Sequence, residues 1–194
     1  MKFSLHFHYI RGIPFIKSFA ICDRCVNFPK KYTMDKKIYL ASPFGFSEAG
    51  RLFLYQVIET ELIGAGYYVL DPWDITPPEV MAEALALPYG PERKNKLREA
   101  NKIIAENNTE AIRLCDGVFA VLDGVDIDSG TASEIGFAAA LGKPILGYRG
   151  DFRLSADNEG ALVNLQVEHF INTSGGKIIT RIDEAIDALK EIIK

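Results

Sequence analysis

From Lys37 onward, short apolar runs alternate with longer stretches of helical periodicity, and this alternation constrains the fold more than any other feature of the sequence. The apolar runs contain few alternating polar residues, which is typical of strands that are buried on both faces. Helical stretches between such strands indicate a parallel sheet with helices on both sides. We therefore expect a flavodoxin-like (Rossmann-like) α/β fold, a doubly wound parallel sheet of about five strands.

The positions of the expected elements follow from this periodicity. The expected strands are 37–44, 67–73, 117–124, 143–149 and, as the fifth, the "VEHFI" run at 167–171. The expected helices are 47–66, 91–116, 130–142 and 181–194. A polar, proline-rich excursion from Asp71 to about Pro91 is too long for a plain connector. Loops of that length in compact domains are usually functional.

Residues 1–33 differ from the rest of the chain. They are basic and aromatic, have no sustained period, and end directly before Met34. The sequence therefore predicts an N-terminal extension of unknown role over 1–33 and one compact domain over 34–194. A zinc site is chemically possible in the extension, but its spacing matches no familiar zinc finger, and no metal is expected. Its residues would be His6, His8, Cys22 and Cys25.

Charge and cysteine content exclude several classes of protein. The formal net charge of -4 argues against a surface that grips nucleic-acid phosphates. No apolar run is long enough to span a membrane, so no membrane partner is expected. Three cysteines cannot form a disulfide framework, and Arg11 and Lys17 interrupt the apolar run that an export signal needs. These features together predict a cytoplasmic protein.

A ligand site is expected beyond the carboxyl ends of the strands, as in other open α/β sheets. This rule marks the positions after Leu40, Leu70 and Leu122. Neither a dinucleotide-binding G-x-G-x-x-G nor a Walker loop is present, so nucleotide-driven chemistry has little support. Four carboxylates follow the third position: Asp123, Asp126, Asp128 and Glu134.

These carboxylates have a structural and a chemical interpretation. Thr131 and Glu134 match a capping box, in which the glutamate only closes the start of its helix. Asp128 or Ser129 could likewise be a simple N-cap. One cap needs one such residue, however, and paired carboxylates at a ligand edge suit the cleavage of a glycosidic bond. Amides at the helix start could hold sugar hydroxyls or keep a carboxylate ionised.

Three segments, "KIYLASPF", "CDGVFAVLDG" and "DSGTASEIGFAAALGKPIL", resemble the nucleoside 2-deoxyribosyltransferase family in their order and separation. The resemblance covers Lys37 to the C-terminus. It implies transfer of 2-deoxyribose between the nucleobases of 2'-deoxynucleosides, with retention, through a covalent deoxyribosyl-glutamate. It also implies a role in nucleoside salvage, with deoxynucleosides and free nucleobases as partners and no cofactor.

The resemblance implies roles for individual residues in the same motifs. Glu134 would be the nucleophile, and the Tyr39 hydroxyl would orient it. Asp128 would hold a sugar hydroxyl, and Gly130 lies beside it in the motif. The alternative for Tyr39 is an aromatic side chain that packs in the core.

The late segment "ALVNLQ" resembles a stretch that enters the site of a neighbouring subunit in this family. Asn164 would then bind the 5'-hydroxyl, and Gln166 would lie close by. Each site would be shared between subunits of a homo-oligomer. The alternative for Asn164 is a turn residue of a loop.

The chain departs from the family pattern at the residue expected to meet the base. Some members have an aspartate there as proton donor, and this chain has Asn108, whose amide cannot act as an acid. The acid could come from Asp74, Asp71 or Glu110, or base departure could depend on contacts of Asn108. The preference for purines or pyrimidines stays open.

Two aromatic residues on neighbouring ligand-side turns, Phe44 and Trp73, could stack on the base, although packing explains such residues as often. Two other functions are compatible with the pattern. One is an N-glycosidase for deoxynucleosides or their 5'-monophosphates, and the other is a nucleotide-binding sensor without catalysis. Relatives that cleave monophosphates have a Ser/Arg/Gly-rich first loop. The loop here offers Ser42, Ser47 and Arg51 but is bulkier and more apolar, which favours a free 5'-hydroxyl.

Overall fold

The computed structural model describes residues 7–10, 13–16 and 36–193. The chain divides into two compact units. One comprises Met1–Tyr32 with Pro77–Ile103, and the other comprises Thr33–Thr76 with Ile104–Lys194. The expected domain boundary at residue 34 lies outside the described residues. The side chains of the possible zinc site in the first segment are not described either, so both stay predictions.

The described residues of the first unit form a hairpin, one helix and the first part of another. Strands β1 (Phe7–Ile10) and β2 (Ile13–Ile16) pair antiparallel. Helix α3 (Pro78–Ala86) lies within the stretch that we expected to be an open excursion. The next helix, α4 (Pro91–Leu114), contacts the end of α3 through Arg93, whose Nη1 donates to the carbonyl of Leu85 at 3.2 Å. The prolines before and at the start of α3 concealed a helix, because proline is well tolerated in a first turn.

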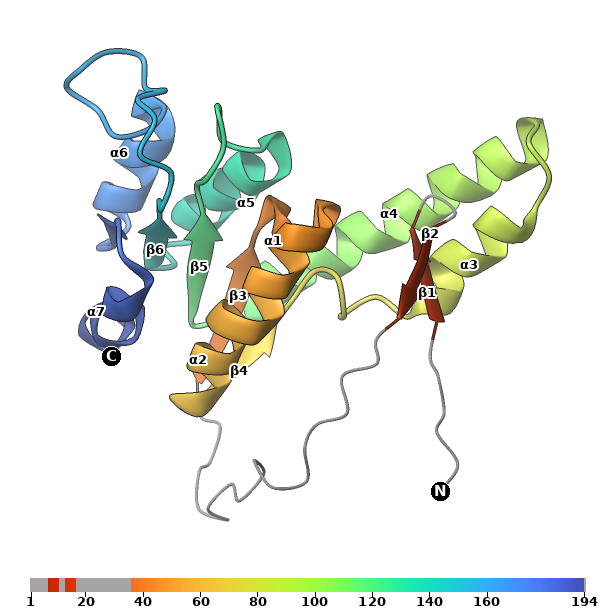
Figure 1. Ribbon diagram of the computed structural model, residues 1–194, viewed down its shortest axis with the longest axis horizontal. Coiled ribbons are helices and arrows are strands. Elements are labelled where there is room, and N and C mark those ends of the chain that lie inside the picture. The colour runs from red at the N-terminus through yellow and green to blue at the C-terminus, as the bar shows by residue number, and fades with distance from the viewer. Residues whose placement is uncertain (1–6, 11–12, 17–35, 194) are drawn as a thin grey trace. The chain divides into compact units, whose positions relative to one another are not determined.

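The second unit contains the parallel sheet of five strands shown in Figure 1. The spatial order is β4-β3-β5-β6-β7, which is the flavodoxin-like order. The expected fold class is therefore confirmed. The strands are β3 (Lys36–Ala41), β4 (Tyr67–Leu70), β5 (Gly117–Val121), β6 (Ile145–Tyr148) and β7 (Lys177–Ile179).

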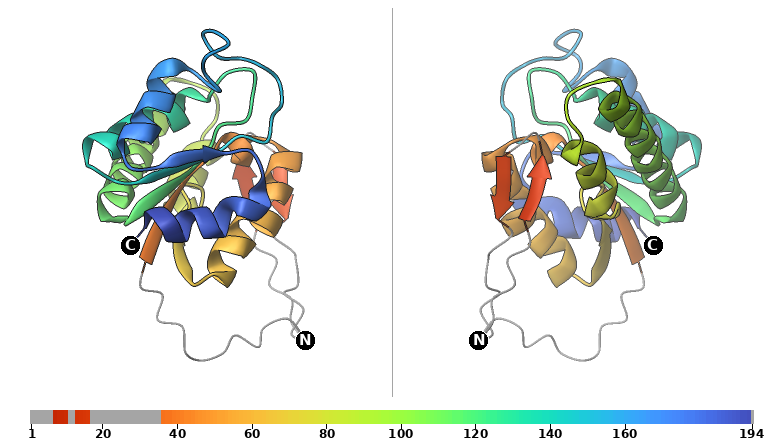
Figure 2. Two further views of the ribbon diagram at one scale, coloured as in Figure 1. Left: turned by 90° about the vertical axis from the view of Figure 1, so that its left-hand side faces the viewer. Right: turned by 90° about the vertical axis from the view of Figure 1, so that its right-hand side faces the viewer.

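Helices cover both faces of this sheet (Figure 2). On one face pack α7 (Ala185–Ile192) and a long first helix. The first helix consists of α1 (Glu48–Phe53), a π-helical turn η2 (Leu54–Glu59) and α2 (Thr60–Gly64). On the other face pack the end of α4, α5 (Ser129–Ala140) and α6 (Leu165–Thr173). Short 3-10 turns η1 (Pro43–Phe46) and η3 (Ile182–Glu184) complete the unit.

The strand periodicity decides which side chains face which helices. Ile38 and Leu40 of β3 lie in the core under the first helix and α7. Tyr39 and Ala41 point to the opposite face, into the core formed with α4, α5 and α6. This alternation places the Tyr39 side chain on the same side of the sheet as α5.

The prediction of a strand at 167–171 is wrong, because these residues lie in α6. Val167 and Ile171 are buried one helical turn apart, and Asn164 caps the helix start. The fifth strand is β7, which follows at Lys177. An apolar run of this length fits either a strand or a buried helix face, which explains the error. No helix in the described residues is long and apolar enough to cross a membrane.

Candidate active site

The candidate site lies at the carboxyl ends of β3 and β5, the central strands at which the order of connections reverses. From β3 the chain crosses to β4 on one side, and from β5 it crosses to β6 on the other. Such a switch point separates the two following loops and leaves a crevice between them. The structure brings Tyr39 and Glu134 together near this edge of the sheet.

Tyr39 and Glu134 form the central contact of the site. The Tyr39 hydroxyl donates a hydrogen bond to Glu134 Oε1 at 2.6 Å. Tyr39 is fully buried on β3, and Glu134 lies in the second turn of α5 and is half-buried. A short bond of this kind, to a carboxylate, fixes the orientation of the Glu134 side chain.

Burial and these neighbours shift the pKa values of both groups. Desolvation raises the pKa of Glu134 from 4.5 to about 7, the Tyr39 hydrogen bond opposes that rise, and the negative charge of Asp128 adds to it. Burial, and then the charge of Glu134, raise the pKa of Tyr39 far above its ordinary value. Tyr39 therefore stays a hydrogen-bond donor, while Glu134 changes its charge near neutral pH.

The capping-box interpretation of Glu134 is wrong, because the helix begins earlier than Thr131. Asp128 is the N-cap of α5, and its Oδ2 accepts from the amides of Gly130 at 2.9 Å and Thr131 at 3.1 Å. Glu134 is therefore beyond the first turn, where it has no orphan amide to satisfy. Asp128 caps the helix and also lies close enough to Glu134 for its negative charge to raise the pKa of that side chain.

Asn164 also caps a helix in its own chain. Its Oδ1 accepts from the amides of Gln166 at 3.1 Å and Val167 at 3.3 Å. This arrangement places Asn164 at the end of the loop between β6 and α6, on the ligand side of the sheet. Gln166 is exposed at the start of α6.

Phe44 and Trp73 have packing partners in the first two loops. The Phe44 ring meets the Phe53 ring edge to face at 5.9 Å and belongs to the rim of the core. Trp73 meets Phe46 edge to face at 4.9 Å. The indole also lies against Gly45, where a Cβ would come within 2.0 Å of the ring. The packing role is therefore visible for both, and their role in base stacking stays a prediction.

Acidic groups gather at the end of β4. Carboxylate oxygens of Glu59, Asp71 and Asp74 lie within 4.8 Å of one another, a spacing that a cation could bridge. Asp71 is buried, and its Oδ1 accepts from the Trp73 amide at 3.0 Å. Burial and then Asp71 raise the pKa of Tyr55 well above its ordinary value.

Asn108 lies on the half of α4 that belongs to the sheet unit. It is one helical turn before Ile112, which packs on the Tyr39 side of the sheet. Its neighbour Asn107 donates to the Thr76 hydroxyl, in the loop after β4, at 3.0 Å. The Asn108 Oδ1 is buried and has no hydrogen-bond partner among the described residues. Glu110, in contrast, is exposed.

The sequence did not draw attention to Arg149, the first residue after β6. Its side chain is buried at 4% exposure. The sequence does hold one signal for this residue: a positively charged side chain directly after an apolar strand, at the expected ligand-binding edge of the sheet.

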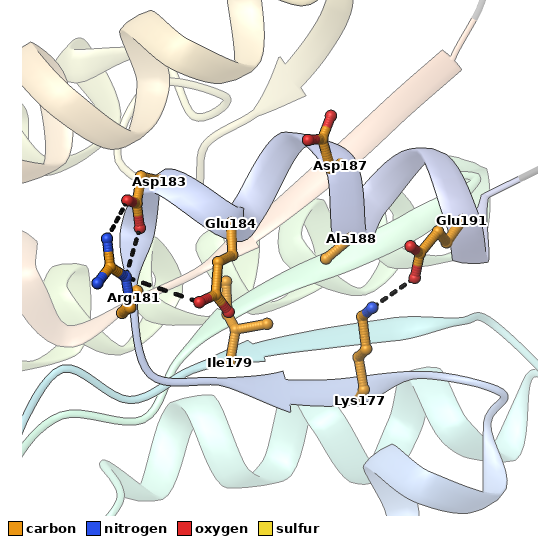
Figure 3. Close-up of a pocket in the computed structure, with 8 residues that line it drawn as sticks. All are labelled: Lys177, Ile179, Arg181, Asp183, Glu184, Asp187, Ala188 and Glu191. Atoms are coloured by element: carbon orange, nitrogen blue, oxygen red, sulfur yellow. Dashed lines mark hydrogen bonds and ion pairs between the residues drawn. The ribbon is translucent and has the colours of Figure 1, made fainter.

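A cavity of about 410 Å³ lies elsewhere, between β7 and α7 (Figure 3). Most of its charged side chains pair with one another, as in the Lys177–Glu191 contact at 2.5 Å and the Arg181–Asp183 contact, and Asp187 pairs with Lys190 outside the lining. It contains none of the predicted site residues. Its lining consists of Lys177, Ile179, Arg181, Asp183, Glu184, Asp187, Ala188 and Glu191.

A family model described as nucleoside 2-deoxyribosyltransferase matches residues 38–166. Three solved structures share the fold. A conserved protein from Enterococcus faecalis V583 is 25% identical, with a TM-score of 0.59 over 80% of this chain and 98% of that one. A 2-deoxyribosyltransferase from Leishmania mexicana is 26% identical, with a TM-score of 0.55 over 80% and 97%.

A 2-deoxyribosyltransferase from Bacillus psychrosaccharolyticus is 25% identical, with a TM-score of 0.54 over 78% of this chain and 90% of that one. No curated protein matches the sequence as a relative.

Proposed function

The chain belongs to the nucleoside 2-deoxyribosyltransferase family, and we propose that it transfers 2-deoxyribose from one nucleobase to another, in nucleoside salvage. The observation that carries this proposal is the 2.6 Å hydrogen bond from the Tyr39 hydroxyl to Glu134 at the switch point of the sheet. It presents one oriented carboxylate beside the crevice where a ligand would bind.

The reaction consists of two displacements at the same carbon. Glu134 attacks C1' of a 2'-deoxynucleoside, the C1'–N bond breaks, and the bond's electron pair leaves with the base, which takes up a proton. The sugar is then held as an ester of Glu134. A nitrogen of the second base attacks C1', gives up its proton and regenerates the carboxylate. Two inversions give net retention, as for retaining glycosidases.

Asp128 and Asn164 are proposed to hold the sugar. The Asp128 cap uses Oδ2, so Oδ1 is left to accept from a sugar hydroxyl. The Asn164 cap uses Oδ1, so Nδ2 is left to donate to the 5'-hydroxyl. In the family arrangement Asn164 and Gln166 would serve a neighbouring subunit, and we propose a homo-oligomer with shared sites.

The base is proposed to meet Asn108, with Trp73 and Phe44 on the loops nearby. The buried Oδ1 of Asn108 accepts no bond from the described residues, so a base N–H would satisfy it. An amide gives the leaving base no proton. The proton therefore comes from Asp74, Asp71, Glu110 or water.

Asn108→Asp should raise kcat for donors whose base leaves poorly, by about tenfold, because a buried protonated carboxyl can act as a general acid. Donors whose base leaves easily should gain less. The measurement is kcat for a purine and a pyrimidine donor in each variant. Asn107→Asp is the matched control, since that side chain bonds Thr76. Equal effects of both variants on both donors would contradict the assignment of Asn108 to the base.

The pH dependence should follow the ionisation of Glu134. Because only the carboxylate attacks, and burial raises its pKa to about 7, kcat/KM should rise as the pH increases through 7. Below about pH 6 it should fall about tenfold per unit. Stability should change in the opposite sense: the folded chain keeps this proton to higher pH than the unfolded chain, so stability is lost between about pH 4.5 and 7.

The test is a profile of kcat/KM against pH together with urea unfolding at each pH. Glu134→Gln is the control for the stability limb, because it removes the titrating group. A kcat/KM that stays constant from about pH 5 to 8 would contradict an ionising nucleophile with this raised pKa.

The geometry of the first loop favours a free 5'-hydroxyl over a 5'-monophosphate. Oγ of Ser42 accepts from the Phe44 amide, and Oγ of Ser47 caps α1 through the Gly50 amide. Arg51 Nη1 donates to the Gly45 carbonyl at 3.0 Å. These contacts engage one Arg51 nitrogen and tie both serine side chains to the backbone of a loop that also carries the bulky Phe44 and Phe46 side chains. This supports a nucleoside substrate over nucleotide hydrolysis.

Chromatography with 2'-deoxyinosine as donor, with and without adenine, tests the proposal, and thymidine as a second donor reports the base class. Formation of 2'-deoxyadenosine only in the presence of adenine supports transfer. Release of hypoxanthine at one rate with or without adenine would make the protein a hydrolase. Thermal stabilisation by the donor without turnover would make it a sensor.

A further inference from the structure

The two loops that carry the proposed sugar-binding residues emerge from neighbouring strands at the same edge of the sheet (Figure 1). The loop after β5 leads to Asp128. The loop after β6 runs from Arg149 to Asn164 and contains no helix or strand. A connection of this length needs specific contacts to adopt one conformation, because each ordered residue loses conformational entropy.

Arg149 supplies such contacts to both loops. Its Nη1 donates to the carbonyl of Leu122, and both terminal nitrogens approach the carbonyl of Gly124 at 3.3 Å. Nη2 also donates to the carbonyl of Arg153 at 3.0 Å and to the hydroxyl of Ser155 at 2.7 Å. One guanidinium therefore joins the loop after β5 to the loop after β6.

The surroundings hold this guanidinium in place. The Arg149 amide donates to the carbonyl of Ile179 on β7, which extends the sheet by one residue. Gly124 has a φ of +134°, a conformation that turns the backbone sharply and that other residues rarely adopt. Beside it, Asp123 Oδ1 accepts from the amide of Asp151 at 2.9 Å, a second bond between the two loops.

Only arginine can make this set of bonds. Its planar fork presents several N–H donors in fixed directions, so one side chain can reach acceptors in two loops. A lysine ammonium concentrates its donors at one point, so it could bond to the carbonyls of one loop but not to the acceptors of the other loop. Removing the donors altogether would leave the buried Leu122 carbonyl without this partner and would remove the part-buried bonds to Gly124 and Arg153, which favours opening of the loop.

We propose that Arg149 is a positioning residue that fixes the β6–α6 loop against the loop that leads to Asp128, and so holds Asn164 in the place from which it reaches the 5'-hydroxyl in the neighbouring subunit's site. This inference rests on the proposed function for its effect on substrate. Arg149 touches no reacting atom. When its bonds are lost, the loop must be ordered each time substrate binds, and this free-energy cost is the same for the bound substrate and for the transition state. KM therefore rises and kcat stays nearly unchanged.

Arg149→Met tests this inference with two measurements. The KM for the deoxynucleoside donor should rise at least about tenfold, with kcat changed less than about threefold. Phe152 and Leu154, which are 95% and 89% exposed in the same loop, are chymotrypsin sites. Cleavage after them should become at least about tenfold faster, because proteolysis follows local opening.

Arg153→Met is the matched control. It removes the same charge from the same loop, but the Arg153 side chain is exposed and pairs with Asp151, while its carbonyl continues to accept from Arg149. Its KM and cleavage rate should equal those of the wild type. Arg149→Lys should lie between wild type and Arg149→Met.

If Arg149→Met does not fold, Ser155→Ala decides, since it removes only one acceptor of the guanidinium. It should raise KM and the cleavage rate about two- to fivefold. Unchanged cleavage in the folded variants would overturn the inference, as would a fall in kcat at constant KM. A wild type that transfers no deoxyribose would instead overturn the proposed function, and cleavage alone would then decide whether Arg149 orders the loop.

Discussion

Glu134→Gln is expected to lower the rate of deoxyribosyl transfer by at least about 10³-fold, because the amide cannot attack C1'. The fold should persist. The carbonyl oxygen of the substituted amide can still accept from the Tyr39 hydroxyl, and a neutral side chain avoids the desolvation that raises the pKa of the native carboxyl. The measurement is initial transfer rate at about pH 8 together with the unfolding temperature.

Glu191→Gln provides the matched control for this substitution. Glu191 is an exposed glutamate on α7, where it pairs with Lys177 far from the switch point in the sheet order. It should keep the wild-type transfer rate. Glu134→Gln with near-normal turnover would exclude Glu134 as the nucleophile, whatever its geometry.

Tyr39→Phe is expected to lower kcat/KM at neutral pH by about 10²-fold through two effects. The carboxylate loses the bond that orients it, and positioning of a reacting group contributes strongly to rate. It also loses the interaction that lowers its pKa, so burial raises the pKa of Glu134 further above 7. The rising limb of the pH profile should therefore move to higher pH, and activity should recover in part above pH 8.

Tyr67→Phe is the appropriate comparison for this second effect. Tyr67 is a buried tyrosine on the adjacent strand β4, and it belongs to the core on the other face of the sheet. Its substitution should leave the pH profile in place even if stability falls. If Tyr39→Phe also left the profile unmoved, the 2.6 Å contact would have no part in setting the charge of Glu134.

The sheet could be predicted from the sequence because its strands are apolar throughout and its helices are amphipathic. The same alternation explains why Tyr39 lies on the α5 side, since neighbouring strand residues face opposite ways. The apolar pattern of residues 167–171 predicts a strand, but burial of Val167 and Ile171 against α5 decides for a helix. Such tertiary contacts are not visible in a short apolar run.

Other features depend on distant residues and could not be predicted locally. From the sequence alone, either Asp128 or Ser129 could cap the helix, and the observed start of α5 decides for Asp128. The buried position of Arg149 depends on carbonyls contributed by two separate loops. The contact of Trp73 with Gly45 likewise joins segments that are adjacent only in the folded sheet. The catalytic roles of the site residues stay predictions.

Intact-mass spectrometry of the protein after incubation with 2'-deoxyinosine alone tests the central claim most directly. We expect a mass gain of one deoxyribosyl group, located by peptide mapping on Glu134, absent from Glu134→Gln and discharged by adenine to give 2'-deoxyadenosine. Release of hypoxanthine with no adduct at any time, even after rapid acid quenching, would contradict a covalent intermediate on Glu134.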